Sequence, residues 1–179
     1  MKIYYVRHGE TNWNLEKKMQ GGEVENLLND TGKKQAEKTK KELENKKYDI
    51  IICSPMERAK QTAHIINNEK NIPMIIDERL RERKIGELNG NQVTEECEEK
   101  IWRYDLNTEI KGGENLYQFE KRILEFLKDI KEKYDNKALL IVAHGGVAKV
   151  IKAYLDGNNK QNDLSNYKME NCEILEIEI

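Results

Sequence analysis

Basic side chains follow three apolar runs of the sequence, close to the point where each run ends. Arg7 and His8 come directly after the first run, His144 comes directly after the last, and Arg58 lies a few residues after the middle one. Two guanidinium groups and two imidazoles gathered in one place would suit a dianion, because guanidinium forks match the geometry of phosphate oxygens. These residue types therefore indicate a phosphate site, provided that the fold brings the three runs together.

The three apolar runs have the composition of strands. Residues 3–6 are β-branched or aromatic, and residues 49–53 and 138–143 are almost continuously apolar, as expected for strands buried on both faces of a parallel sheet. Parallel strands end at one carboxyl edge, which is where open α/β sheets bind ligands. We therefore expect the two arginines and the two histidines to meet in a single crevice.

Helical patterns separate these strands. Residues 116–134 place apolar side chains at spacings of three and four, which is typical of an amphipathic helix. Residues 31–47 are dense in Lys and Glu and predict a surface helix. Residues 147–155 predict an apolar helix that ends at Gly157.

The start of one further helix bears directly on Arg58. Ser54, Pro55 and Glu57 match the N-cap, first and third positions of a capping box, which predicts that a helix starts here. Helical side chains lean toward the N-terminus, so Arg58 can reach back over the end of the preceding strand. We also expect the positive ends of this helix and of the helix near Gly146 to face the anion.

Two shorter patterns complete the predicted sheet. Residues 73–76 suggest a short strand, and residues 172–179 alternate apolar residues with Glu, as in an edge strand with one wetter side. The alternation of strands and helices predicts an α/β fold, a three-layer sandwich whose mainly parallel central sheet is flanked by helices. Because no linker is visible, we expect a single domain over residues 1–179.

Composition and motifs exclude several classes of protein. The net charge of -2 argues against a nucleic-acid or anionic-membrane surface. No apolar run approaches the roughly 20 residues that span a bilayer, and the chain enters a strand at once, so we expect a cytoplasmic protein without a signal peptide. The three scattered cysteines indicate free thiols. Neither a Walker-type loop nor a His-x-x-x-His pair is present, so we expect no metal and no cofactor.

Each candidate residue has a simpler interpretation when it is taken alone. A strand-end arginine is more often part of a surface ion pair, and a histidine beside glycine is more often a hydrogen-bonded loop residue. Glu82, in the charge-rich loop 77–84, would by itself be a solvated carboxylate, and His64 does not share the helix face of Arg58. Three basic strand ends in a chain with only three histidines favour the ligand site over these alternatives.

Short motifs along nearly the whole chain resemble those of one enzyme family. The main ones are Arg7-His8-Gly9-Glu10-Thr11 with Trp13-Asn14, Ser54-Pro55 with Arg58-Ala59, Arg79-Leu80-Arg81-Glu82, Gly112-Gly113-Glu114 and Ala143-His144-Gly145-Gly146. Their order and spacing are similar to the histidine phosphatase superfamily, in the branch that is similar to cofactor-dependent phosphoglycerate mutase. Each motif alone is modest, but the set is specific.

The resemblance implies roles for the matching positions. His8 would be the nucleophile that takes the phosphoryl group on a ring nitrogen, and Glu82 would protonate the leaving oxygen and later deprotonate water. The implied phosphate-binding and substrate-binding residues are Arg7, Thr11, Asn14, Arg58, Arg83, His144 and Gly145, of which Arg7, Arg58 and His144 belong to the catalytic set. No metal is required, because phosphoryl transfer depends mainly on positioning and charge neutralisation.

Two physical conditions accompany these roles. His8 must be neutral at its attacking nitrogen, so its other ring nitrogen must donate a hydrogen bond, for example to a backbone carbonyl. The cationic neighbours of Glu82 favour its ionised form, so its role as an acid depends on the bound phosphate dianion or on burial.

Three functions stay open at this level. The first is a metal-independent phosphatase that acts on a small phosphorylated metabolite through a phosphohistidine on His8. The second is a cofactor-dependent phosphoglycerate mutase, because Arg83 stands where a mutase-like loop would place an arginine against a substrate carboxylate. The third is a non-catalytic phosphate-binding module. Residues 17–25 and 91–111, the latter a helix or a lid, are expected to determine specificity, and the sequence leaves the substrate and the oligomeric state open.

Overall fold

The computed structural model describes residues 1–106, 108–157 and 163–179, and this part of the chain contains one five-stranded sheet in the order β3-β2-β4-β1-β5. The strands are β1 (Lys2–Arg7), β2 (Ile50–Cys53), β3 (Met74–Ile76), β4 (Ala138–Ala143) and β5 (Ile174–Glu178). The first four run parallel, and β5 pairs antiparallel with β1 at one edge. The predicted α/β fold, with its mainly parallel sheet and C-terminal edge strand, is confirmed.

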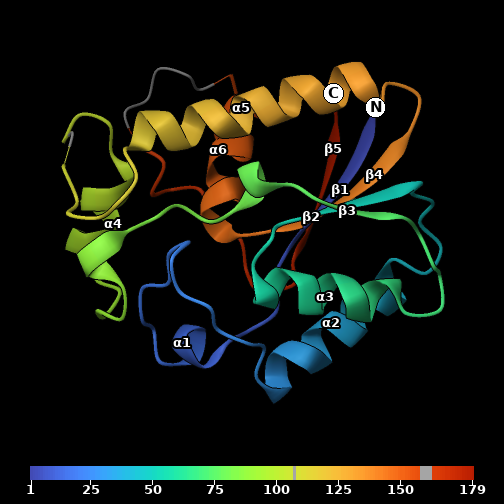
Figure 1. Ribbon diagram of the computed structural model, residues 1–179, viewed down its shortest axis with the longest axis horizontal. Helices are drawn as coiled ribbons and strands as arrows, with labels where there is room; N and C mark the ends of the chain where they lie inside the picture. The colour runs from blue at the N-terminus through green and yellow to red at the C-terminus, as the bar shows by residue number, and fades with distance from the viewer. Residues whose placement is uncertain (107, 158–162) are drawn as a thin grey trace.

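Helices cover both faces of the sheet (Figure 1). One face carries α2 (Asp30–Glu42) and α3 (Glu57–Asn67), and the other carries α5 (Leu116–Lys133) and α6 (Gly145–Leu155). Toward one end of the sheet lie the short helices α1 (Asn12–Leu15) and α4 (Glu95–Trp102). Two 3-10 helices, η1 (Glu78–Leu80) and η2 (Gly86–Leu88), lie in the connection between β3 and α4.

An apolar core on each face of the sheet holds the layers together. Tyr4 and Val6 of β1 belong to the core under α2 and α3, whereas Ile3 and Tyr5 belong to the core under α5 and α6. The split follows from the alternation of side chains along a strand. Phe119 of α5 is fully buried in the second core. The strand ends that carry the candidate residues are therefore anchored on both sides.

The helix predicted over residues 31–47 is shorter than expected. It starts at Asp30, one residue after the N-cap Asn29, and ends at Glu42. Leu43, which follows, is fully buried in the core under α2 and α3. The chain forms a turn over residues 43–45. Here the buried Leu43 side chain is kept in the core while the polar residues that follow stay in solvent.

The capping box predicted at Ser54 is wrong. The helix α3 starts at Glu57, and its N-cap residue Met56 makes no capping hydrogen bond with its side chain. The Ser54 hydroxyl accepts the Met56 amide at 3.3 Å and bonds the His144 ring at 2.7 Å, so it belongs to the turn before the helix. The Glu57 amide donates to the Glu25 carboxylate at 3.0 Å. The first amide of α3 is therefore already bound by a carboxylate and is not available to an anion, contrary to the expectation.

Other predicted boundaries shift by a few residues. The last strand begins at Ile174 and not at Cys172, because Cys172 has a positive φ of 59° and its amide donates to the Arg7 carbonyl. The helix predicted over residues 147–155 already begins at Gly145. In the segment 91–111, the open choice between helix and lid resolves to helix α4 in its middle. None of the helices in the described part of the chain is long and apolar enough to cross a membrane.

Candidate active site

A cavity of about 330 Å³ lies at the carboxyl ends of β1 and β4. Its wall comes from the end of β1, from α1, from the loop after η1 and from the start of α6. The predicted site residues in this wall are Arg7, His8, Asn14, Glu82, Arg83 and Gly145. Arg58 and His144 lie behind it, with no exposed surface. The parallel register of β1 against β4 places Arg7 opposite Ala143, so the two histidines that follow lie side by side.

His8 is held in one tautomer by its own neighbour. Its side chain is buried, and Nδ1 lies 2.8 Å from the Gly9 carbonyl oxygen. Because a carbonyl oxygen only accepts, Nδ1 must carry the proton, which leaves the lone pair on Nε2. Burial, followed by the charges of Arg58 and Arg7, holds the pKa of His8 well below its usual value. His8 is therefore neutral and has a nucleophilic nitrogen, as the predicted role requires.

Arg58 is an arginine without solvent contact. Its Nη1 donates to the Val24 carbonyl at 2.9 Å and its Nη2 to the Gly21 carbonyl at 3.3 Å. Its Nε is buried and has no partner among the described residues. Burial lowers the pKa of Arg58 to about 10, so the guanidinium stays charged at neutral pH. Two backbone carbonyls thus fix the head group beside the histidines and leave Nε without a partner in the described chain.

His144 is supported by two hydroxyl groups that the sequence did not reveal. The Ser54 hydroxyl lies 2.7 Å from Nε2, and the Tyr5 hydroxyl donates to the His144 carbonyl at 2.6 Å and accepts its amide at 3.0 Å. The ring centroids of His144 and His8 are 5.2 Å apart. Burial, and then the charge of Arg58, holds the pKa of His144 well below its usual value. The neutral ring leaves Nδ1 unpaired within the described chain.

Arg7 joins the site to the segment before β5. Its Nη1 donates a hydrogen bond to the Met169 carbonyl, and Met169 itself lines the cavity. The Nε of Arg7 is buried and lacks a partner in the part of the chain that the structure describes. Burial lowers the pKa of Arg7. Since a guanidinium remains charged nonetheless, the cavity has a fixed positive charge next to His8.

Glu82 is held by two backbone amides. Oε1 accepts the Arg83 amide at 2.8 Å and Oε2 accepts the Gly146 amide at 2.9 Å. A Cβ on Gly146 would lie 2.2 Å from Oε1 of Glu82, so only glycine permits this approach. The start of α6 lines the cavity, as expected of a helix end that faces the anion, but its Gly146 amide is already bound to Glu82.

The remaining predicted binding residues divide into two groups. Asn14 lines the cavity, and its Oδ1 accepts the Thr11 amide at 3.1 Å, which leaves the amide nitrogen of Asn14 as the donor for a ligand. Gly145 also lies in the wall. Thr11 does not: it is fully buried as the N-cap of α1, and its hydroxyl lies 3.1 Å from the side-chain oxygens of both Asn14 and Gln20, to either of which it can donate. Thr11 thus orients Asn14 and does not itself reach the cavity.

Two cationic residues of the wall, Arg83 and Lys149, lie beside the indole ring of Trp102. The guanidinium carbon of Arg83 lies 5.6 Å from the ring centroid of Trp102, and the Lys149 ammonium lies 5.4 Å from it. Lys149 also donates to the Ser165 and Tyr167 carbonyls at 3.1 and 2.9 Å. The sequence interpretation missed Lys149, although a lysine inside an apolar helix was a signal that could have found it.

A family model described as the histidine phosphatase superfamily (branch 1) matches residues 3–179. The chain belongs to this superfamily. The family resemblance and the prediction of a histidine phosphatase-type enzyme are confirmed. The match runs through every candidate residue, from the strand end at Arg7 to the helix start at Gly145.

Relatives of this chain bear the names of phosphatases and of phosphoglycerate mutase-like proteins. The chain is 35% identical over 159 residues to "Uncharacterized phosphatase PhoE" of Bacillus subtilis, which covers 89% of this chain and 79% of that protein. It is 33% identical over 159 residues to "Metal-independent phosphoserine phosphatase" of Arabidopsis thaliana, covering 84% and 66%. Among solved structures, Bacillus stearothermophilus YhfR superposes with a TM-score of 0.88 at 29% identity, covering 99% of this chain and 91% of that one.

Proposed function

We propose that this protein is a metal-independent phosphatase that hydrolyses small-molecule phosphate monoesters through a phosphohistidine intermediate on His8. One observation carries the proposal. In the described part of the chain, six buried side-chain nitrogen or oxygen atoms have no hydrogen-bond partner, and four belong to predicted site residues, namely Arg7, Arg58, Arg83 and His144. An unpaired buried donor costs about 1–3 kcal/mol. We expect phosphoryl and substrate oxygens to pair with these donors.

The first half of the reaction forms the covalent intermediate. Nε2 of His8 attacks phosphorus in line while the bond to the leaving oxygen breaks, and Glu82 gives that oxygen its proton. The guanidinium groups of Arg7 and Arg58 neutralise charge on the equatorial oxygens, which is the main demand of phosphoryl transfer. The Nδ1–H group of His8 keeps donating to the Gly9 carbonyl, which stabilises the positive charge that develops on the ring.

The second half releases phosphate. The ionised Glu82 takes a proton from water, the water oxygen bonds to phosphorus, and the N–P bond breaks to return a neutral His8. The Gly146 amide at the start of α6 donates to Oε2 of Glu82 at 2.9 Å, which fixes the carboxylate for this proton transfer.

Hydrolysis of 4-nitrophenyl phosphate in excess chelator tests this mechanism. The wild-type protein and a His64→Ala variant, which removes an exposed histidine of α3, should both release nitrophenol. His8→Ala should fall to the uncatalysed background, and mass spectrometry after an alkaline quench should find phosphate on His8 of the wild-type protein. Activity that survives His8→Ala, or that chelator abolishes, would contradict the proposal.

One observation favours a second candidate, a phosphoglycerate mutase. Arg83 lines the cavity, burial lowers its pKa to about 10, and its Nη1 has no partner among the described residues, so it is available to a substrate carboxylate. This reaction would interconvert 2- and 3-phosphoglycerate and depend on a bisphosphate primer. Release of free phosphate from the same substrates without isomerisation would exclude it.

A further inference from the structure

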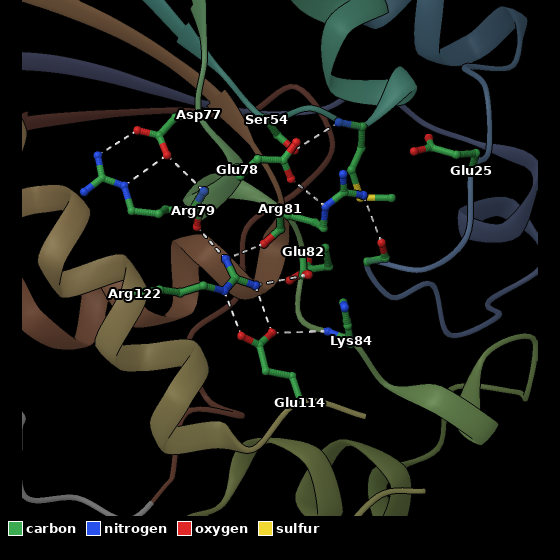
Figure 2. A network of polar contacts seen from close by, with 12 residues as sticks. Glu25, Ser54, Asp77, Glu78, Arg79, Arg81, Glu82, Lys84, Glu114 and Arg122 are labelled. Atoms are coloured by element: carbon green, nitrogen blue, oxygen red, sulfur yellow. Dashed lines mark hydrogen bonds and ion pairs between the residues drawn. The ribbon is translucent and has the colours of Figure 1, made fainter. Parts of the chain in front are cut away.

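Arg122, on the second turn of α5, uses all of its hydrogen-bond donors on the Glu114 carboxylate and on the backbone of residues 79–82. Its Nε and Nη2 bind the Glu114 carboxylate at 2.8 and 2.9 Å. Its Nη1 donates to the carbonyls of Arg79 and Arg81, and its Nη2 donates to the carbonyl of Glu82 at 3.3 Å. A guanidinium has five N–H donors, and all five have an acceptor here. Figure 2 shows the head group at the centre of this network.

The backbone that Arg122 binds is the backbone that carries Glu82. This residue lies outside regular structure, since η1 ends at Leu80. Two contacts limit where Glu82 can lie. Its carboxylate accepts the Gly146 amide at 2.9 Å, and its backbone carbonyl accepts Nη2 of Arg122. The loop is therefore held from both sides, by α6 through the carboxylate and by α5 through Arg122.

Glu114 extends the same clamp to the next two residues. Its backbone carbonyl accepts Nε of Arg83 at 3.0 Å, and its amide donates to the Lys84 carbonyl at 2.8 Å. The Arg122 side chain is only 20% exposed, and its guanidinium lies 4.6 Å from the centroid of the Phe119 ring. Such a buried, bidentate pair holds geometry far better than a surface ion pair, because planar forks lose little freedom on binding.

We propose that Arg122, oriented by Glu114, is a positioning residue that holds the Glu82 carboxylate where it transfers the proton to the leaving oxygen. Arg122 itself is not part of the cavity wall, and the site residue that it binds directly is Glu82, through its backbone carbonyl. The inference rests on the acid role of Glu82 in the proposed function. A small displacement of this loop would move the Glu82 carboxylate away from the leaving oxygen and weaken proton transfer. The His8 nucleophile and the arginine cluster would stay in place.

The test compares two substrates of similar shape that differ in their need for an acid. 4-Nitrophenyl phosphate expels a stable anion without a proton, whereas 4-nitrobenzyl phosphate expels an alkoxide that needs one. We expect Arg122→Lys to lower kcat/KM for the benzyl ester about tenfold more than for the phenyl ester, as part of the roughly 10²–10⁴-fold that a general acid contributes. Lysine keeps the charge but cannot span five acceptors. Glu114→Gln should shift the same ratio in the same direction.

Arg79→Lys is the matched control. Arg79 lies in the same loop and binds Asp77 and Asp129 through its side chain, but that side chain does not contact the clamp. Its substitution should leave the ratio of the two substrates unchanged. An equal shift in Arg79→Lys would overturn the proposal, because any damage to the loop would then explain the effect.

Two other results separate the possible failures. If Arg122→Lys and Glu114→Gln lower both substrates equally, or not at all, Arg122 has only a structural role and the inference is wrong. If Glu82→Gln itself leaves the ratio unchanged, the acid role of Glu82 fails, and with it that part of the proposed function. Thermal unfolding of each variant identifies any that does not fold, and Glu114→Gln then carries the test in place of Arg122→Lys.

Discussion

His8 and His144 are neighbours with different supports, and the difference suits different tasks. The Nδ1–H group of His8 donates to the Gly9 carbonyl, so its other nitrogen, Nε2, carries a lone pair that can attack. Nε2 of His144 can accept a hydrogen bond from the Ser54 hydroxyl, so the unpaired Nδ1 carries the proton and can donate to an oxygen. Two identical side chains thereby present opposite hydrogen-bonding character to one phosphoryl group.

Gly146 decides whether Glu82 reaches its place, and Gly146→Ala tests this. An added Cβ would lie 2.2 Å from Oε1 of Glu82 and 2.4 Å from the Trp102 ring, so the carboxylate must move. We expect a loss in kcat/KM of ~10²-fold, as for other displacements of about 1 Å at a reacting group. Gly145→Ala is the matched control, because its Cβ would meet Arg7 at an ordinary 3.5 Å. Equal losses in both variants would contradict the prediction.

Backbone amides at the starts of α3 and α6 donate to carboxylates of the protein itself. Glu25 takes the first amide of α3, and Glu82 takes the Gly146 amide of α6. The positive potential of the site therefore comes mainly from arginine side chains and less from helix ends. The helix α5 contributes differently, since it lies outside the cavity wall and reaches the site through Arg122.

The N-cap of α5 offers a test of stability at this scale. The Asn115 side chain accepts the Tyr117 amide at 2.9 Å. Asn115→Ala should lower the free energy of unfolding by about 1 kcal/mol, the usual cost of a lost cap. Asn115→Ser, which retains a capping oxygen, should lie within a few tenths of a kcal/mol of the wild type. Chemical denaturation measures both, and equal losses in the two variants would show that the cap contributes nothing.

The charged site lies at one edge of a sheet whose two faces are covered by apolar cores. The sheet has apolar cores on both faces, and the cavity lies where β1 and β4 end. Burial there lowers the pKa values of His8, His144, Arg7 and Arg58 together. Folding therefore brings cationic or neutral groups into a region of low dielectric, which costs stability and raises the attraction for a dianion. That residues 1–179 form one domain stays a prediction.

Stability should fall with acid in a defined window. His8 and His144 have folded-state pKa values well below 6.5, so the unfolded chain binds more protons than the folded protein once the pH drops below that value. The contribution of the two neutral rings is fully present above about pH 6.5 and is lost as the pH falls toward their folded-state pKa values. Denaturation at about pH 7.5, 6.5 and 5.5, on both sides of the usual histidine pKa, measures it.

His8→Gln provides the comparison for this slope. Removing one of the two rings should make the decline of unfolding free energy between about pH 6.5 and 5.5 shallower. A wild-type stability that stays level or rises over this interval would contradict the lowered pKa values. So would a slope that the substitution leaves unchanged.

Much of the fold and of the site could be predicted from local patterns. The strand runs ending at Val6, Cys53 and Ala143 were readable because buried parallel strands need continuous apolar residues. The end of α2 at Glu42 and the start of α3 at Glu57 could not be predicted in this way. Leu43 packs in the core and Ser54 bonds His144, and both contacts join residues far apart in the sequence. Thr11 was assigned to the ligand for the same reason: its neighbours in sequence do not show that its hydroxyl is already bound.

The sequence by itself determined which residue types meet at one sheet edge, and with them the family and the kind of chemistry. Topology does this, since parallel strands that end in Arg7, His8 and His144 have one edge to share. Only the tertiary structure decided which donors stay free, which tautomer His8 adopts and what holds Glu82. Those outcomes depend on hydrogen bonds between groups far apart in the chain, such as Arg122 with Glu82, and no local pattern encodes such a pairing.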